Sequence, residues 1–164
     1  MPKREGTGYV MWLGKGAAGN YEWGNRMYQT GNSEGRANRI SGYAFNLSGG
    51  LGVGAYFEDP VSTSRYVLVT LVVDTIDKSL SPNGLIRMYK NGVLRQSTGL
   101  TQSYAKVNPE NGTAPFRIGT RNLASYFQGA IAKVAVWPTI LANTRITAHY
   151  SAMCPSGSGT PGCS

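Results

Sequence analysis

The feature that most constrains the fold is a series of short strand-like segments in the second half of the chain, with a tight turn between two of them. Residues 64–74 (SRYVLVTLVVD) are rich in β-branched and aromatic side chains between polar ends, which is typical of a buried strand. Residues 85–90 and 93–97 flank Asn91-Gly92, the dipeptide that most readily takes the two positive φ angles of a type I′ turn, so we expect a β-hairpin there. A series of short strands buries its apolar faces by stacking two sheets.

Further segments extend this pattern on both sides of the hairpin. The other predicted strands are residues 9–13, 21–29, 37–46, 56–57, 115–120, 126–131 and 132–137, and the glycine-rich residues 47–54 are expected to turn. Residues 141–153 (LANTRITAHYSAM) fit a short helix with Leu141, Ile146 and Tyr150 toward the core and Asn143 as its N-cap. The sequence therefore predicts an all-β protein, an antiparallel two-sheet sandwich with one short C-terminal helix.

Size and charge narrow the classes of partner. The chain has 164 residues, which suits one domain, and a formal net charge of +8. Its sixteen Lys and Arg residues are scattered, with Lys3-Arg4 as the one adjacent pair, and no nucleic-acid fold signature appears. We therefore expect a solvated cationic surface and no nucleic-acid partner, with a positive patch that favours acidic glycans or anionic cell surfaces as the alternative.

The two terminal segments indicate in which cellular compartment the protein is expected. Cys154 and Cys163 both lie in a Gly-, Ser- and Pro-rich segment, so we expect residues 1–153 to form the domain and residues 154–164 a tail. The flexible spacer between the cysteines favours a small disulfide loop and an oxidising compartment, and two unpaired thiols are the alternative. No stretch reaches the roughly 18 apolar residues of a membrane span. The first ten residues lack the apolar core of a signal peptide.

Three segments, taken in order, are similar to the motifs of one known family. They are RYVLVTLVVD followed by IRMYKNGVLRQS, then APFRIGTRNLASYFQGAIAKVAVW, then PTILANTRITAHY. With WLGKGAAGNYEWGNRMY near the start, residues 9–153 resemble the concanavalin A-like lectin/glucanase superfamily, specifically its bacterial laminin-G-like and pentraxin-like jelly-roll modules. The resemblance implies a jelly-roll fold and does not specify a ligand.

The resemblance also carries an expectation about the N-terminal edge. Relatives usually have one or two strands before the segment that aligns with residues 13–16 (LGKG). This chain is expected to start just after the place where those strands end. The expected sandwich therefore lacks the usual first strand or strands and would expose an unpaired edge. We expect a homo-oligomer or a partner chain to complete that edge.

The acidic residues disfavour an enzyme. Retaining glycosidases need two carboxyl groups about 5–5.5 Å apart, and none of the eight acids forms the Glu-x-Asp-x-x-Glu type of strand found in catalytic relatives. The single histidine, His149, lies on the predicted helix and is not expected to act as a base. Many relatives bind calcium, and Asp59, Asp74 and Asp77 are weak candidates for its ligands, with solvated turn acids as the alternative.

Aromatic faces with nearby arginine and amide groups suit a sugar ligand. The candidate site for a glycan or polysaccharide consists of Trp23, Tyr28, Arg39, Tyr43, Arg121 and Tyr126, with core or sheet packing as the alternative for each. Strand alternation places Tyr21, Trp23 and Asn25 on one face. The leading interpretation is a non-catalytic carbohydrate-binding or adhesion module of an extracellular or virion-surface protein. The alternatives are a structural module that assembles by edge-strand pairing and a glycan-active enzyme.

Overall fold

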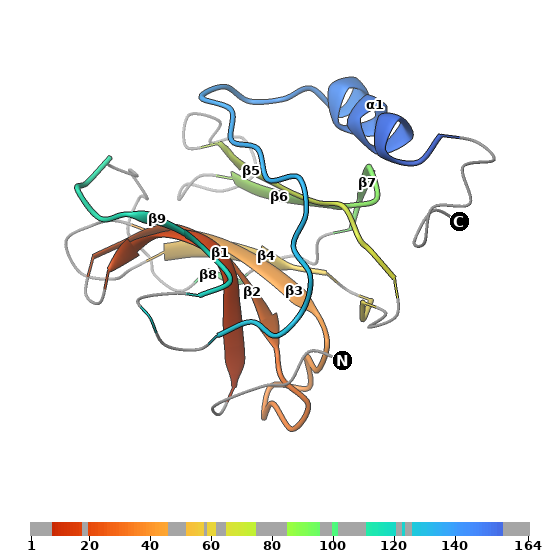
Figure 1. The fold of residues 1–164 in the computed structure, drawn as a ribbon. Coiled ribbons are helices and arrows are strands. Elements are labelled where there is room, and N and C mark those ends of the chain that lie inside the picture. Colours follow the sequence, from red (N-terminus) through yellow and green to blue (C-terminus); the bar gives the residue numbers. More distant parts are fainter. Residues whose placement is uncertain are drawn as a thin grey trace.

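In the described part of the chain, the fold consists of two antiparallel sheets and one helix (Figure 1). The structure, a computed structural model, describes residues 8–17, 20–45, 52–57, 59–61, 65–74, 85–95, 100–101, 111–120, 123 and 126–155. Their elements are β1 (Tyr9–Ala17), β2 (Asn20–Tyr28), β3 (Ile40–Phe45), β4 (Gly52–Tyr56), β5 (Val69–Asp74), β6 (Leu85–Lys90), β7 (Val93–Leu94), β8 (Leu100–Thr101), β9 (Phe116–Ile118) and α1 (Asn143–Met153). The six-stranded sheet has the order β8-β4-β3-β2-β1-β9, and the three-stranded sheet has the order β5-β6-β7. This arrangement confirms the predicted two-sheet sandwich with a short C-terminal helix.

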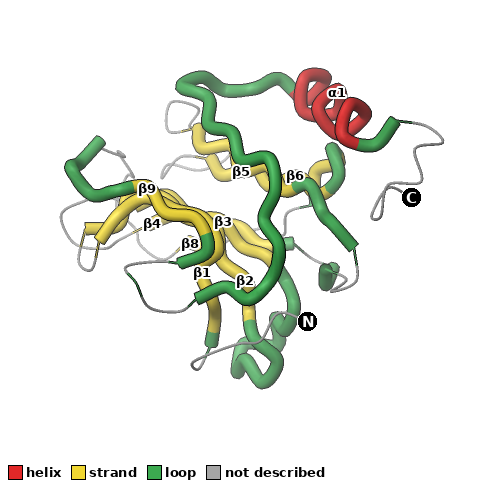
Figure 2. The backbone as a smooth tube through the Cα atoms, in the orientation of Figure 1, coloured by secondary structure: helices red, strands yellow, loops and turns green. Residues whose placement is uncertain are grey.

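The main core lies between the two sheets, which form separate layers in Figure 2. It consists of Val10, Met27, Ile40, Ala44, Val53, Ala55 and Phe57 with Ile86 and Met88 of β6. The sheets approach closely at Gly42, because a Cβ there would lie 2.5 Å from Leu71 Cδ1. Since strand side chains alternate, the core positions Ile40 and Ala44 leave Ser41, Tyr43 and Phe45 on the opposite face of the six-stranded sheet.

The helix α1 covers the other side of the three-stranded sheet (Figure 1). Ile146 is fully buried against Val72 and Tyr89, and Leu141 packs on the same cluster, as predicted. Full burial of a side chain of this size stabilises the fold by about 1.5–3 kcal/mol. The prediction for Asn143 was wrong, because the helix begins at Asn143, Ala142 holds the cap position, and the Asn143 side chain accepts a hydrogen bond from the Tyr89 hydroxyl.

The hairpin is confirmed together with its turn. Asn91 and Gly92 have φ angles of 53° and 77°, the two positive values that a type I′ turn requires. A Cβ on Gly92 would lie 3.1 Å from Tyr150 Cβ and 3.2 Å from Thr147 Cα, so α1 packs directly against this turn. The local turn sequence thereby fixes both the hairpin and a helix contact.

Three predicted segments differ from the structure. Residues 52–54 of the expected turn belong to β4, because aromatic rings from β3 lie across the glycines of that strand. No residue of the described run 126–137 belongs to a strand, although two strands were predicted there. Lys133 has a φ of 51°, which interrupts an extended conformation, and the run passes from the β9 side of the molecule toward α1 (Figure 1). The short strand β8, which pairs with β4, was not predicted.

The strand order locates the edges of the large sheet. The first described strand, β1, lies between β2 and β9, and it pairs with β9 from Leu13 to Lys15. The outer strands of this sheet are therefore β8 and β9. The predicted division of the chain after residue 153 stays a prediction, because residues 156–164 lie outside the described part.

Candidate functional site

The most distinctive polar cluster lies on the face of the six-stranded sheet turned away from β5, β6 and β7, which we call the outer face. Strand register assembles it, because Arg26 is paired with Ser41, Ser41 with Tyr56, and Tyr9 with Tyr28. Paired residues on neighbouring strands project on the same side. The members are Tyr9, Arg26, Tyr28, Ser41, Tyr43 and Tyr56, joined by Arg36 and Arg39 from the loop between β2 and β3.

A buried arginine holds the centre of the outer face. Arg26 Nε donates to Ser41 Oγ at 3.1 Å, and Arg26 Nη2 donates to the hydroxyl groups of Tyr28, at 3.4 Å, and Tyr43. The two tyrosine oxygens are 3.1 Å apart, and both side chains are buried. The Arg26 guanidinium also lies 3.9 Å from the centroid of the Tyr43 ring and 4.1 Å from that of the Tyr9 ring. Phenol oxygens and ring faces thus stabilise this desolvated charge.

Burial sets the protonation of the central tyrosine. It raises the pKa of the Tyr43 phenol above its ordinary value, and the neighbouring Arg26 charge only partly opposes that rise. Tyr43 is therefore a neutral hydroxyl group at physiological pH, which can both donate and accept a hydrogen bond.

Glycines make room for the rings beside this centre. A Cβ on Gly54 would lie 2.4 Å from Tyr43 Cδ1, and one on Gly52 would lie 2.5 Å from Phe45 Cδ1. Tyr43 stacks on Phe45 with centroids 5.7 Å apart and an interplanar angle of 15°, and Tyr21 lies 5.7 Å from Phe45 on a tilted plane. The glycines of β4 thus allow three aromatic rings to lie in series across the outer face.

Two loop arginines place positive charge at the solvent side of the outer face. Arg36 Nη1 donates to the Tyr28 hydroxyl at 3.2 Å, and its guanidinium lies 4.5 Å from the Tyr56 ring centroid. The Arg39 guanidinium lies 5.7 Å from the same ring. Arg36 also forms an ion pair with Glu34, whose side chain is 47% exposed against 23% for Arg36. The half-exposed Tyr56 ring is therefore flanked by two cations.

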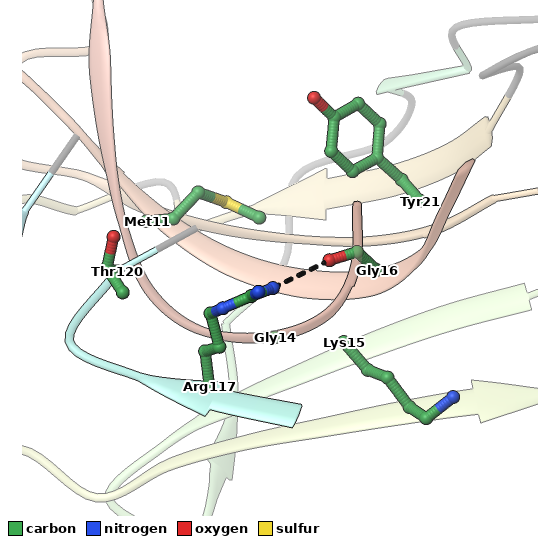
Figure 3. Close-up of a pocket in the computed structure, with 7 residues that line it drawn as sticks. All are labelled: Met11, Gly14, Lys15, Gly16, Tyr21, Arg117 and Thr120. Atoms are coloured by element: carbon green, nitrogen blue, oxygen red, sulfur yellow. Dashed lines mark hydrogen bonds between the residues drawn. The ribbon is translucent and has the colours of Figure 1, made fainter. Parts of the chain in front are cut away.

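A shallow depression extends the outer face toward β9 (Figure 3). It is lined by Met11, Gly14, Lys15, Gly16, Tyr21, Arg117 and Thr120. The enclosed space is small, with room for about one water molecule. Arg117 Nη1 donates to the Gly16 carbonyl at 3.3 Å, and Lys15 Nζ donates to both oxygens of the buried Glu22 carboxylate and to the Gly112 carbonyl. Tyr21 belongs to both the depression and the aromatic series, so the two are continuous.

The predicted glycan residues are only partly brought together. Tyr28 and Tyr43 meet at the centre of the outer face, and Arg39 lies beside Tyr56. Trp23 is placed elsewhere, because it pairs with the core residue Ala44 and contacts Phe116 with ring centroids 5.6 Å apart. Tyr126 lies in the run after β9 and is 46% exposed, and Arg121 falls outside the described residues.

A β-bulge explains why the side chains of β2 do not alternate regularly between the two faces of the sheet. Lys15 pairs with Trp23 and Gly16 with Tyr21, so Glu22 is an extra residue on β2. Tyr21 therefore packs with Phe45 on the outer face while Trp23 lies on the side of Ala44. The predicted shared face of Tyr21 and Trp23 was wrong. The predicted set of glycan residues also left out Tyr9, Arg26, Arg36 and Tyr56, although the Arg26-x-Tyr28 and Ser41-x-Tyr43 pairs on successive strands were a usable signal.

The described carboxylates are all engaged with cations. Glu22 is 2.6 Å from Lys15 Nζ, Glu34 pairs with Arg36, Asp59 pairs with Lys90, and Asp74 is 3.6 Å from an Arg87 nitrogen. The structure therefore gives Asp59 and Asp74 basic partners, and Asp77, the third calcium candidate, lies outside the described residues. In that part of the chain no group of three His, Cys, Asp or Glu side chains is placed to hold a metal ion.

Comparison with known proteins gives one match. Residues 5–147 match a laminin-G-type family model described as the Concanavalin A-like lectin/glucanases superfamily. Comparison with curated proteins and with solved structures gave no match. Among the described helices, none is long and apolar enough to cross a membrane.

Proposed function

The chain belongs to the concanavalin A-like lectin/glucanase superfamily, and we propose that it is a non-catalytic carbohydrate-binding module. The match covers most of the chain and agrees with the two-sheet fold. Since one fold serves many functions, the proposal rests on the residues of the outer face rather than on the family alone.

The observation that carries the proposal is the combination of half-exposed rings with a rigid buried centre. Tyr9, Tyr21 and Tyr56 are each half-buried, so part of each ring is available to stack on the apolar side of a pyranose. Arg36 and Arg39 supply donors for sugar hydroxyl groups beside Tyr56. Tyr28 and Tyr43 are buried, so their role in this proposal is to fix the surface rather than to contact the sugar.

The ion pairs of the carboxylates favour binding without catalysis. Glycoside hydrolysis needs one carboxylic acid and one carboxylate facing the same bond. Each of the four described acids instead faces a lysine or arginine. Basic partners therefore occupy the carboxylates that the structure describes, which supports binding rather than hydrolysis.

For localisation we propose an extracellular or surface-associated protein, including a virion surface, with a role in adhesion. In support, Cys154 is disulfide-bonded, which is typical of oxidising compartments. Cys163 lies outside the described residues, so its pairing with Cys154 stays a prediction.

A second candidate, a structural module that assembles by edge-strand pairing, is favoured by one observation. The edge strand β9 carries Phe116 and Ile118, which are 39% and 51% exposed. An apolar edge of this kind suits strand addition by a second copy or another chain. Light scattering tests this candidate. A parent protein that is monomeric at high concentration, with an Ile118→Lys variant that is equally monomeric, would count against it.

The glycan proposal is tested by a glycan array followed by calorimetric titration of the best ligand. Tyr56→Ala and Tyr21→Ala should each weaken binding about 5- to 100-fold, the effect of losing one ring stacked on the ligand. Tyr66→Ala is the matched control, because Tyr66 is an exposed tyrosine just before β5 in the other sheet. An array without any bound glycan, or equal affinity for all three variants, would overturn the proposal.

A further inference from the structure

The outer face carries several arginine side chains. The basic side chains of this face and its depression are Arg26, Arg36, Arg39 and Arg117, and Glu34 is the described acidic side chain that forms an ion pair with one of them. Lys15 also lines the depression, but it pairs in register with Trp23 on the core side, and its ammonium group is held by the buried Glu22 carboxylate. Glu34 is the one described acid that shares the exposed rim of the face with these arginines.

Arg36 is held in place by more than its ion pair. Its Nη1 donates to the buried Tyr28 hydroxyl, and its guanidinium rests over the Tyr56 ring. The backbone of the loop is fixed as well, because Asn32 Oδ1 accepts hydrogen bonds from the amide groups of Glu34, at 2.9 Å, and Arg36, at 3.4 Å. Removing Glu34 from Arg36 would therefore leave the guanidinium oriented by Tyr28 and Tyr56.

The ion pair itself is weak and replaceable. Exposed ion pairs contribute little to stability, because water solvates both partners and side-chain entropy opposes the contact. With Glu34 nearly half exposed, a ligand carboxylate or sulfate that reaches Arg36 exchanges one anionic partner for another. Arginine suits both anions, since its planar donors match two oxygens at once.

We propose that the outer face selects glycans that carry acidic groups, and that Arg36, released from Glu34, is the residue that recognises them. Glu34 acts as an internal competitor that occupies Arg36 until such a ligand binds. A sugar ring stacked on Tyr56 would bring a carboxylate or sulfate group to Arg36 and its neighbour Arg39. This inference rests on the proposed carbohydrate-binding function.

The experiment compares ligands of matched length by calorimetric titration at two salt concentrations. The probes are a neutral galacto-oligosaccharide, an oligogalacturonate, a heparin-derived sulfated oligosaccharide and a single-stranded DNA oligonucleotide. We expect at least one acidic oligosaccharide to bind about tenfold more tightly than the neutral one, the usual size of one charge-assisted contact. The uronate and sulfate probes identify which anion is preferred.

Variants then assign the effect to Arg36. Arg36→Gln should remove the preference for the acidic oligosaccharide, so that this variant binds the acidic and the neutral oligosaccharide with equal affinity. Glu34→Gln should strengthen acidic binding about threefold, because the competitor is lost. Two controls change the net charge by the same amounts elsewhere: Arg145→Gln on the exposed side of α1 and Asp59→Asn beside Lys90. Both controls should bind like the parent protein.

The outcomes separate the two proposals. Equal affinity for neutral and acidic glycans, or a Glu34→Gln variant that binds no better than Asp59→Asn, overturns this inference and leaves the carbohydrate-binding proposal standing. DNA that binds as tightly as the acidic glycan overturns it too, since the face would then be a general polyanion surface. A protein that binds no glycan of any kind overturns both proposals.

Discussion

Replacing Gly54 by alanine tests whether the glycines of β4 are required by the outer face. The new Cβ would lie 2.4 Å and 2.5 Å from two atoms of the Tyr43 ring and 2.8 Å from the Gly42 carbonyl oxygen. Gly42 belongs to the paired strand β3, so its carbonyl cannot retreat without breaking the ladder. The Tyr43 ring must move instead, and its hydrogen bonds with Arg26 and Tyr28 would be lost.

The expected loss of stability has two parts. Overpacking a filled site costs about 1–3 kcal/mol, and a lost hydrogen bond to a charged group costs about 1.5–3 kcal/mol. Alanine recovers about 0.5–1 kcal/mol through its lower backbone entropy in the unfolded chain. The free energy of unfolding should therefore fall by about 2–5 kcal/mol, a large share of the 5–15 kcal/mol typical of a domain.

Gly24→Ala is the matched control for this measurement. A Cβ on Gly24 would also meet an atom at 2.4 Å, but that atom is the terminal methyl group of Met11, and the nearest backbone atom is 3.5 Å away. A methionine end can change rotamer, so the loss should stay below about 1 kcal/mol. Urea denaturation followed by tyrosine and tryptophan fluorescence gives both values. Equal midpoints for the two variants would refute the reasoning that the Tyr43 ring is fixed in place.

Three further predictions follow from the structure. Because burial raises the pKa of the Tyr43 phenol, Tyr43 contributes stability that is fully present below about pH 10, its unfolded value, and is lost as the pH rises through the folded value. Urea midpoints between pH 8 and pH 11 should therefore fall less steeply for Tyr43→Phe than for the parent, whereas the exposed control Tyr66→Phe should show the parent slope. Ile146→Ala should cost about 2–5 kcal/mol, because this residue alone of α1 is fully buried. Limited proteolysis should then cut near α1, and an unchanged digestion pattern would argue against that packing. EDTA should leave the melting temperature unchanged, because Asp59 and Asp74 already pair with Lys90 and Arg87; a shift of several degrees on adding Ca²⁺ would contradict this.

The sequence by itself determined the elements whose geometry is local. Asn91-Gly92 specified the hairpin because its two residues readily take the positive φ angles of the turn. The β-branched run before Asp74 indicated β5, and the spacing of Leu141 and Ile146 identified the buried side of α1. These features depend on neighbours a few residues away, so they can be predicted from the sequence.

Tertiary structure alone decided which side chains meet on the outer face. The extra residue Glu22 in β2 turned Tyr21 and Trp23 to opposite faces, and no local pattern marks a bulge whose position is set by pairing with β1. Gly52 and Gly54 are strand residues only because Phe45 and Tyr43 need the space, which a strand 7–11 residues away provides. The contact of Arg26 with Tyr43 likewise follows from the register between β2 and β3. Register is a property of two strands together, and one strand's sequence does not contain it.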